Sequence, residues 1–258
     1  MMYRIVKVLN HNTFIGIRSK DKCKCLIMGK GIAFGRKVSE SISVGEDAKV
    51  YTLTELTERG SAEEIIRSVP PECLELAGEI LDHAEKVFGQ IDRSILFPMA
   101  DHLAFAVQRI RNQEQISNPL TEDIRILFHQ EYKVAKCAEQ LLRERLHVEI
   151  DEHEIGYIAL HVHAAIEDQK VSQAMQLTRA VRDCISLVEK QTGTTIDVMS
   201  LSYNRLMNHI RYMVARALSG GKTEGKYERL YFHTFSKSIR YGIPGVRRND
   251  EKSEDLPG

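Results

Sequence analysis

The period of the hydrophobic pattern changes once along the chain, at about residue 62, and this change limits the folds that the sequence can adopt. Before it, polar turns separate four β-rich segments, namely YRIVKVL, TFIGI, KCKCLIM and AKVYTL. Such segments predict a small antiparallel sheet of four strands. After it, apolar residues recur at helical spacing and β-branched runs disappear. The sequence therefore predicts a small all-β domain followed by an all-helical part.

Two helical segments resemble each other at an offset of 107 residues. DHLAFAVQRI (101–110) and NHIRYMVARA (208–217) align without gaps, and each has a histidine followed seven residues later by an arginine. This offset is about the length of one domain, which favours duplication of a helical module. The second copy is expected to be incomplete, because the counterpart of His161 would fall near position 268 of a chain of 258 residues.

These patterns predict four segments. The β domain is expected over residues 1–58, a first helical domain over 64–168 and a partial second helical domain over 172–240. The segment 241–258 has no helical period and is rich in charge, Pro and Gly, so we expect it to be disordered. The helix EIGYIALHVHAAI is expected to start at a capping box made by Asp151 and Glu154 and to bury one apolar stripe.

The charge of the chain is unevenly distributed, although the net charge is zero. Residues 1–37 contain nine Lys or Arg and a single acid, Asp21, so this segment carries +8 and the other 221 residues carry −8. A basic segment on an acidic body indicates a polyanion partner for that segment, and we favour nucleic acid over a merely soluble basic domain.

Composition also excludes several classes of protein. No run approaches the roughly 18 apolar residues of a membrane span, and we see no secretion signal. The five cysteines are scattered and form no CxxC pair, which supports neither a disulfide framework nor a structural zinc site. A cytoplasmic location is the simplest setting for such a chain.

The glycine-rich stretch LIMGKGIAFG (26–35) raises the question of a nucleotide site. Its spacing is GxGxxxG instead of GxGxxG, and a poor helix follows, so a dinucleotide fold is disfavoured. The segment GGKT (220–223) is disfavoured as a P-loop, because Arg216 stands where the first glycine belongs. A tight turn between strands explains the glycines but not Lys30 and Phe34.

A lysine and an aromatic ring in such a loop can approach a nucleic-acid backbone and stack on a base. The turn NHN (10–12) adds amide groups of the kind that read base edges. If both turns lie at the same end of the sheet, they form one basic, aromatic and amide-bearing surface.

Three histidines, His102, His161 and His209, lie beside apolar helical stripes. A lone histidine in such a place is more often structural, but the repeated position raises the interest of these residues. His161 and His163 cannot bind one metal ion, because side chains two residues apart on a helix point about 200° apart. A histidine can instead carry a phosphoryl group. No catalytic set of residues stands out, so we expect neither an enzyme nor a cofactor nor a metal site.

Five motifs together resemble one family of bacterial proteins. They are KVLNHN, LIMGKGIAFGRK, MADHLAFAVQR, EIGYIALHVHAA and YNRLMNHIRYMVAR, and they occur in the order that the family has. The family is that of the BglG/SacY/LicT-type transcriptional antiterminators of the sugar phosphotransferase system (PTS), and the chain is most similar to its glucose-system branch. The resemblance covers residues 1 to about 218.

This resemblance implies a multidomain protein with a small antiparallel β-sheet RNA-binding domain and two all-α PTS regulatory domains (PRDs), the second incomplete. Such proteins bind a leader-mRNA hairpin as homodimers and prevent formation of an overlapping terminator upstream of sugar-uptake genes. The permease EIIB domain and the phosphocarrier HPr phosphorylate the regulatory domains, often with opposite effects.

The resemblance also implies functional residues. His11 departs from the asparagine that is commoner in this turn. The phosphorylated residues would be His102 and His161 in the first regulatory domain and His209 in the second. The RNA contacts would be Lys7, Asn10, Asn12, Gly29, Lys30 and Phe34.

Two other functions remain open from the residues alone. A DNA-binding activator with the same regulatory domains would need a helix-turn-helix in place of the predicted strands. A histidine phosphotransfer protein would pass its phosphoryl group from His102 or His161 onward to another acceptor.

Overall fold

The chain forms two compact units, Met1–Ala174 and Met175–Gly258. The first unit contains every predicted site residue except His209. The computed structural model describes residues 1–54, 56–57, 60–114, 116–168, 170–196, 203, 205–207, 209–210, 212–213 and 246–248.

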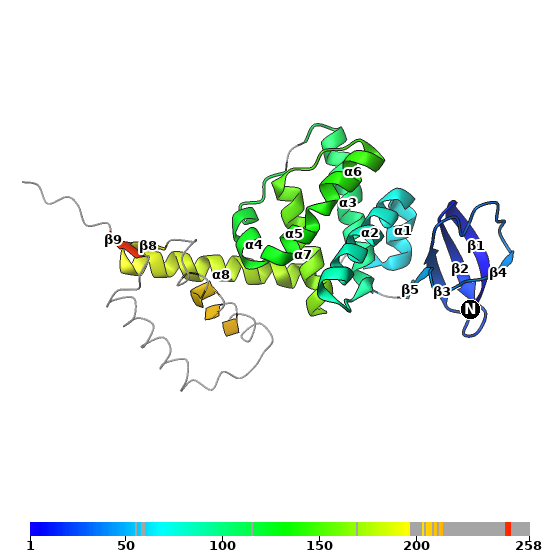
Figure 1. The fold of residues 1–258 in the computed structure, drawn as a ribbon, viewed down its shortest axis with the longest axis horizontal. Helices are drawn as coiled ribbons and strands as arrows, with labels where there is room; N and C mark the ends of the chain where they lie inside the picture. Colours follow the sequence, from blue (N-terminus) through cyan, green and yellow to red (C-terminus); the bar gives the residue numbers. More distant parts are fainter. Residues whose placement is uncertain are drawn as a thin grey trace, which may run out of the picture. The chain divides into compact units, whose positions relative to one another are not determined.

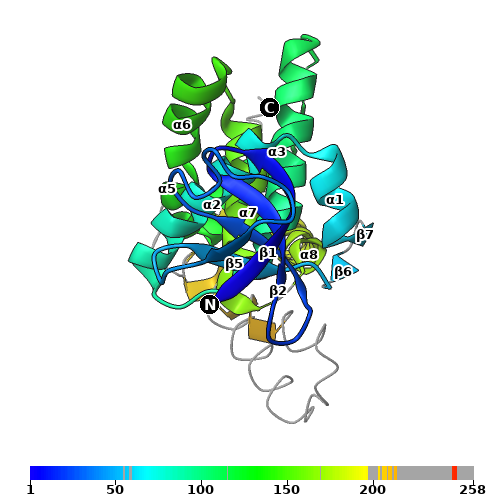
Figure 2. The same cartoon turned by 90° about the vertical axis from the view of Figure 1, so that its right-hand side faces the viewer.

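An antiparallel sheet opens the first unit, as the sequence predicts, but it has a fifth strand (Figures 1 and 2). The missed strand, Ser41–Ser43, pairs with the start of the first strand, and its three residues are too few to show a period. The strands follow the order β4-β1-β2-β3-β5. They are β1 (Met2–Asn10), β2 (Thr13–Arg18), β3 (Lys24–Met28), β4 (Ser41–Ser43) and β5 (Lys49–Thr52).

Strands β2 and β3 are buried on both faces, whereas β1 is buried mainly on one. Tyr3, Phe14 and Ile27 belong to a core on one face, and Leu26 and Met28 are buried on the other. A strand buried on both faces needs apolar side chains at successive positions, which explains why CLIM reads as a continuous apolar run. The second face is the one that meets the helices.

Among the described residues, seven α-helices follow the sheet in the first unit, and an eighth leads into the second unit (Figure 1). They are α1 (Ala62–Ser68), α2 (Pro71–Phe88), α3 (Leu96–Arg111), α4 (Thr121–Leu127), α5 (His129–Ala135), α6 (Cys137–Leu146), α7 (Glu152–Glu167) and α8 (Val171–Thr192), with a 3-10 turn, η1 (Arg93–Ile95), before α3. The short strands are β6 (Leu56–Thr57), β7 (Gly60–Ser61), β8 (Thr194–Ile196) and β9 (Val246–Arg248).

The helix α7 is central to the helical part. It contacts α3, α4, α5 and η1, and almost every residue from Glu154 to Ala165 is buried. The predicted stripe is buried, but so are residues on the other faces of this helix. A helix that is apolar on all sides belongs in the interior of a bundle. Asp151 caps α7 as predicted, because its carboxylate accepts from the backbone N–H groups of His153 and Glu154.

The start of the helical part lies close to its predicted boundary. The helix α1 begins at Ala62, two residues before the predicted boundary at 64, because Ser61 and Glu64 form a reciprocal capping box. The helix α7 ends at Glu167, and the first helical domain was predicted to extend to residue 168.

Much of the predicted second helical domain (172–240) and of the predicted tail (241–258) lies outside the described residues. Of the repeated segment 208–217, the described residues 209, 210, 212 and 213 are helical. In the tail, Val246–Arg248 pairs with β8. Among the described helices, none is both long and apolar enough to cross a membrane.

Candidate functional site

Two turns that are distant in sequence are joined by hydrogen bonds at one end of the sheet. The turn after β1 folds on itself, because the Asn12 N–H donates to Asn10 Oδ1 at 2.9 Å. Asn12 Oδ1 in turn accepts from the Gly31 N–H at 2.8 Å. The Ala33 N–H donates to the His11 carbonyl oxygen at 3.0 Å. Residues 10–12 and 29–34 therefore form one surface, called the turn surface below.

The turn surface presents cations and an aromatic ring to solvent. Phe34 is 68% exposed, although it is a large apolar side chain. Lys30 is exposed within the surface, and Lys7 on β1 is exposed nearby in sequence. The ring of His11 meets the ring of Phe34 edge to face, with centroids 5.2 Å apart. The structure thus gives His11 a place beside the ring that is predicted to stack on a base.

Gly29 and Gly31 are glycines for different structural reasons. A Cβ at Gly29 would lie 3.3 Å from the Cβ of Ala48, so this predicted contact residue is also constrained by packing. Gly31 has a φ of +65° and open space where a Cβ would lie. Gly31 is therefore the residue that the turn needs as glycine. It was not among the predicted contacts, although its position between Lys30 and Phe34 in sequence could have singled it out.

The amide nitrogens of the turn surface point toward the helical part. Asn10 Nδ2 donates to Glu75 Oε1 on α2 at 2.7 Å. Asn12 Nδ2 lies 3.3 Å from the same oxygen. Two of the predicted contact residues are thus engaged by the helical part of the first unit.

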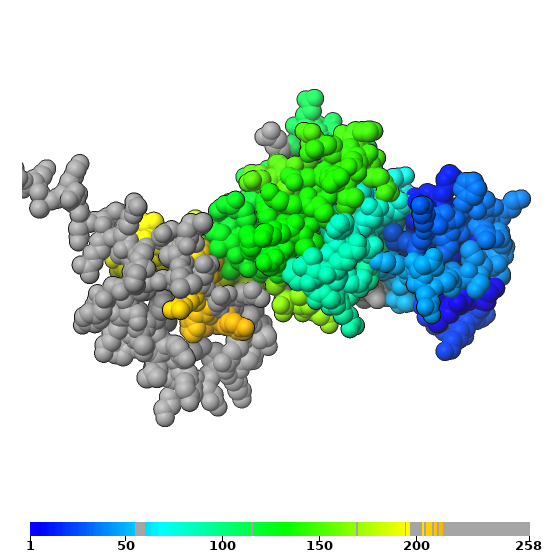
Figure 3. Space-filling view, viewed as in Figure 1, coloured from blue at the N-terminus to red at the C-terminus, as the bar shows by residue number. Residues whose placement is uncertain are grey.

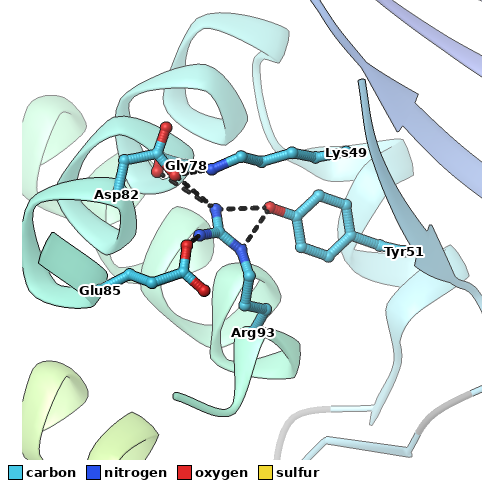
Figure 4. Close-up of polar contacts among 6 residues, drawn as sticks. All are labelled: Lys49, Tyr51, Gly78, Asp82, Glu85 and Arg93. Carbon is cyan, nitrogen blue, oxygen red and sulfur yellow. Dashed lines mark hydrogen bonds and ion pairs between the residues drawn. The ribbon is translucent and has the colours of Figure 1, made fainter. Parts of the chain in front are cut away.

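A second polar cluster joins the sheet to the helices around Arg93 (Figure 4). The guanidinium group donates to the Tyr51 hydroxyl oxygen from Nε at 3.2 Å and from Nη2 at 3.0 Å, and it forms ion pairs with Asp82 at 2.8 Å and Glu85 at 2.9 Å. Lys49 also contacts Asp82. Burial raises the pKa of the Tyr51 hydroxyl, although Arg93 opposes this shift. In the space-filling view, the surface of the sheet adjoins that of α1 and α2 (Figure 3).

The structure brings His102 on α3 and His161 on α7 together, with ring centroids 5.2 Å apart. Glu154 lies beside them and is 2% exposed. Its two oxygens face different cations, since Oε2 is 3.1 Å from His102 Nε2 and Oε1 is 2.7 Å from Arg109 Nη2. These four residues, His102, Arg109, Glu154 and His161, are called the histidine pocket below.

Burial and hydrogen bonding act in opposite directions on Glu154. Burial raises the pKa of its carboxyl group, but its interactions with His102 and with the hydrogen-bonding Arg109 outweigh burial, so the pKa lies below its ordinary value. Glu154 is therefore ionised at neutral pH. Sequence reasoning assigned this residue to a capping box, whereas its side chain reaches the histidine pocket instead.

Hydrogen bonding assigns a proton within the ring of His161. Its Nδ1 lies 2.8 Å from the carbonyl oxygen of Tyr157, one turn earlier on α7. A carbonyl oxygen only accepts, so Nδ1 carries the proton and the lone pair of the neutral ring is on Nε2. In His102 it is instead Nε2 that faces a neighbour, since this nitrogen lies 3.1 Å from the Glu154 carboxylate. The two rings thus use different ring nitrogens in these contacts, Nδ1 in His161 and Nε2 in His102.

His163 lies apart from the histidine pocket, as helical geometry predicts. Its ring stacks on Phe128 at 4.1 Å, and its Nδ1 is 2.9 Å from Glu131 Oε1. It is 1% exposed, which suits a structural histidine. No group of three metal-binding side chains gathers within the described part of the chain. His209 is half-buried and belongs to the second unit.

Two family models match the chain. A CAT RNA binding domain matches residues 3–59, and a PRD domain matches residues 78–165. The first covers the sheet and the turn surface, and the second covers both histidines of the pocket. The match gives the same order of domains as the five sequence motifs predict.

Three curated relatives are similar along most of their length. Transcription antiterminator LicT of Bacillus subtilis is 26% identical over 86% of this chain and 80% of its own length. The beta-glucoside operon antiterminator of Dickeya chrysanthemi is 28% identical over 83% of this chain and 76% of its own. The GlcA/glcB genes antiterminator of Staphylococcus carnosus is 27% identical over 84% of this chain and 77% of its own length.

A solved structure has the same domain pair. The crystal structure of GlcT CAT-PRDI superposes with a TM-score of 0.54 and 26% identity. The match covers 64% of this chain and 99% of the other. A CAT domain followed by a PRD domain is thus an arrangement that the solved GlcT structure also contains.

Proposed function

The chain belongs to the transcription antiterminators that join a CAT RNA binding domain to a PRD domain, and we propose that it binds a leader-mRNA hairpin and prevents formation of an overlapping terminator. The observation that carries this proposal is the turn surface, in which two turns of a +8 segment meet. The basic charge would attract the phosphate backbone. Paired A-form RNA hides its base edges in a deep, narrow groove, so the protein would read distorted or unpaired positions of the hairpin.

Within the turn surface, each proposed contact has a distinct role. Phe34 would stack on a base, since its ring is already exposed to solvent. Lys30 would contact phosphate, and the amides of Asn10 and Asn12 would read base edges. Gly29 would allow close approach of the backbone, and Lys7 would add a cation beside the turns.

We assign regulation to the histidine pocket. His102 and His161 would accept phosphoryl groups from the permease EIIB domain, and the second-unit residue His209 would accept one from HPr. A phosphoryl group adds roughly 1.5–2 negative charges. Next to the ionised Glu154, this charge would reorganise the contacts between α3 and α7. In a homodimer, such a change could separate the two RNA-binding halves.

We propose glucose as the sugar that controls the protein. Relatives named for glucose genes and for β-glucoside genes have similar identities to this chain, at 27% and 28%. The solved structure that matches the chain carries the name GlcT, which supports the glucose system. The decisive measurement is phosphorylation of the full chain by glucose-type and β-glucoside-type EIIB domains in parallel. Transfer from the β-glucoside domain alone would reassign the sugar.

RNA binding is tested with the full chain and the leader hairpin that precedes its target operon. Filter binding should give an affinity that falls about tenfold or more between about 50 mM and about 200 mM salt. A hairpin with its distorted positions repaired to paired bases is the matched control, and it should bind more weakly. Binding that is absent, or that does not respond to salt, would contradict the proposal.

A further inference from the structure

The asparagine amides proposed to read RNA are already hydrogen-bonded to the regulatory domain. Asn10 Nδ2 lies 2.7 Å from Glu75 Oε1, and Asn12 Nδ2 lies 3.3 Å and 3.4 Å from the two oxygens of the same carboxylate. Glu75 lies on α2, 65 residues from Asn10 in sequence. Its side chain is only 11% exposed, so this contact is largely shielded from water.

The orientation of both amides follows from their other partners. The oxygen of Asn10 accepts from the Asn12 N–H, and the oxygen of Asn12 accepts from the Gly31 N–H. Because each oxygen is held by a backbone donor, each NH2 group must point away from the turns. The amide groups that the asparagines direct toward a partner are therefore their NH2 donors. Glu75 supplies acceptor oxygens, and acceptors are also what RNA phosphates and base carbonyl groups would supply.

Arg145 near the end of α6 holds Glu75 in place. Its Nη2 donates to Glu75 Oε2 at 2.6 Å, and its Nη1 donates to Glu79 Oε1 at 2.8 Å. One guanidinium group thus bridges two carboxylates on successive turns of α2. Glu75 is paired on one side by Arg145 and on the other by the asparagines, which compensates its burial.

We propose that Glu75, positioned by Arg145, is an internal competitor for RNA. In the conformation of this structure it occupies the amide donors of Asn10 and Asn12, whereas Lys30 and Phe34 remain exposed. RNA could then meet the protein through charge and stacking, but it would gain the asparagine contacts only after Glu75 withdraws. This inference rests on the proposed RNA-binding function, and it links the regulatory domain directly to the RNA-reading groups.

The other contacts between sheet and helices lie outside this competition. Lys24 pairs with Glu63 on α1 at 2.7 Å, and Arg93 binds Tyr51 and Asp82 (Figure 4). None of these residues belongs to the turn surface. They can keep the sheet attached to the helices while the Glu75 contact opens, so the competition can be tested without separating the domains.

The test is RNA affinity of the full chain with Glu75→Ala. Loss of the competing acceptor should raise RNA affinity about fivefold. This is about the net contribution of one charge-assisted hydrogen bond, because part of its strength is offset by the lost hydrogen bonds to water. Glu79→Ala is the matched control, because it also removes one negative charge from α2, and Glu79 also pairs with Arg145. It lies outside the hydrogen bonds to the asparagines and should change affinity less than twofold. Glu75→Asp keeps the charge but shortens the side chain, and it should also raise affinity.

A double-mutant cycle separates competition from general charge effects. Asn10→Ala removes both the RNA contact and the Glu75 contact, so it should weaken RNA binding more in the Glu75→Ala background than in the wild type. Thermal unfolding of each variant identifies any that fails to fold, and Glu75→Asp then replaces Glu75→Ala. If the wild type binds RNA but neither Glu75 variant binds more tightly than the Glu79 control, the competition is wrong and the proposed function stands. If no form of the protein binds the hairpin, the proposed function fails, and the competition fails with it.

Discussion

The turn surface and the histidine pocket are built in opposite ways. The turn surface consists of two short segments, and its shape comes from hydrogen bonds between side-chain amides and nearby backbone groups. The histidine pocket joins α3 and α7, whose key residues are about fifty positions apart. Phe34 in the first is 68% exposed, whereas Glu154 in the second is 2% exposed. The exposed turn surface is arranged to receive a large partner. The buried histidine pocket would have to open before a partner could reach its side chains.

The largest expected effect concerns which ring nitrogen of each pocket histidine is modified. Phosphorylation should occur at Nε2 of His161, because its Nδ1 is held by the Tyr157 carbonyl oxygen, and at Nδ1 of His102, because its Nε2 faces Glu154. Antibodies that separate the two phosphohistidine isomers can check this on His102→Ala and His161→Ala variants, in which one site remains. The same isomer at both sites would contradict the geometry of the pocket.

Substitution of Glu154 should affect stability. Glu154→Ala leaves Arg109 and His102 without their shared carboxylate, and we expect a loss of about 3 kcal/mol in the free energy of unfolding. This value is at the low end for a buried pair, because Arg109 is about a quarter exposed. Urea unfolding measures it. Glu152→Ala, on the same helix but exposed, is the control and should change stability by about 0.5 kcal/mol or less. Equal losses of stability in both variants would show that Glu154 contributes no more to stability than an ordinary surface charge.

Substitution of Phe34 should affect binding instead of stability. Phe34→Ala should cost about 1–3 kcal/mol in RNA binding, because it removes a stacking face. Its unfolding free energy should stay within about 0.5 kcal/mol of the wild type, since the ring is mostly in solvent. Val38→Ala removes another exposed apolar side chain nearby and serves as the control. Undiminished affinity of Phe34→Ala would remove this residue from the site.

The smallest expected effect tests the backbone of the turn surface. Gly31→Ala forces an alanine into a φ of +65° where no atom would collide with its Cβ, so strain should cost about 1 kcal/mol of stability. Thermal or urea unfolding of the full chain measures this cost. Gly35 has a similar φ of +69° and equally open space, so Gly35→Ala should lower the free energy of unfolding by a similar amount. A different effect on RNA binding would then show that Gly31 lies closer to the RNA.

Contiguous motifs made the turn surface largely predictable. Asn10, Asn12, Lys30 and Phe34 stand in two short stretches between strands, and strand pairing alone brings these stretches to one end of the sheet. The strand β4 was missed, because three residues carry no periodic signal. Gly31 was missed, although its position between Lys30 and Phe34 could have indicated it; its positive φ became visible only in the structure.

The histidine pocket was predictable only in part. The repeat singled out His102, and the resemblance added His161, but no local pattern could place one beside the other. Glu154 satisfies the sequence rule for a capping box, but in the structure its side chain pairs with Arg109 on α3 instead. The contact between Glu75 and the asparagines was likewise invisible, since it depends on how the sheet packs against α2.

The burial of α7 on all sides has a kinetic consequence. His161 is 6% exposed, so, as the proposed phosphorylation site, it would be reached by a phosphoryl donor only while the surrounding helices are apart. The rate of modification then cannot exceed the rate of this opening, however abundant the donor is. Short pulses of donor would leave few molecules marked, whereas sustained supply would mark most of them. A proposed phosphorylation site enclosed in the interior would thus respond to the duration of a signal more than to its height.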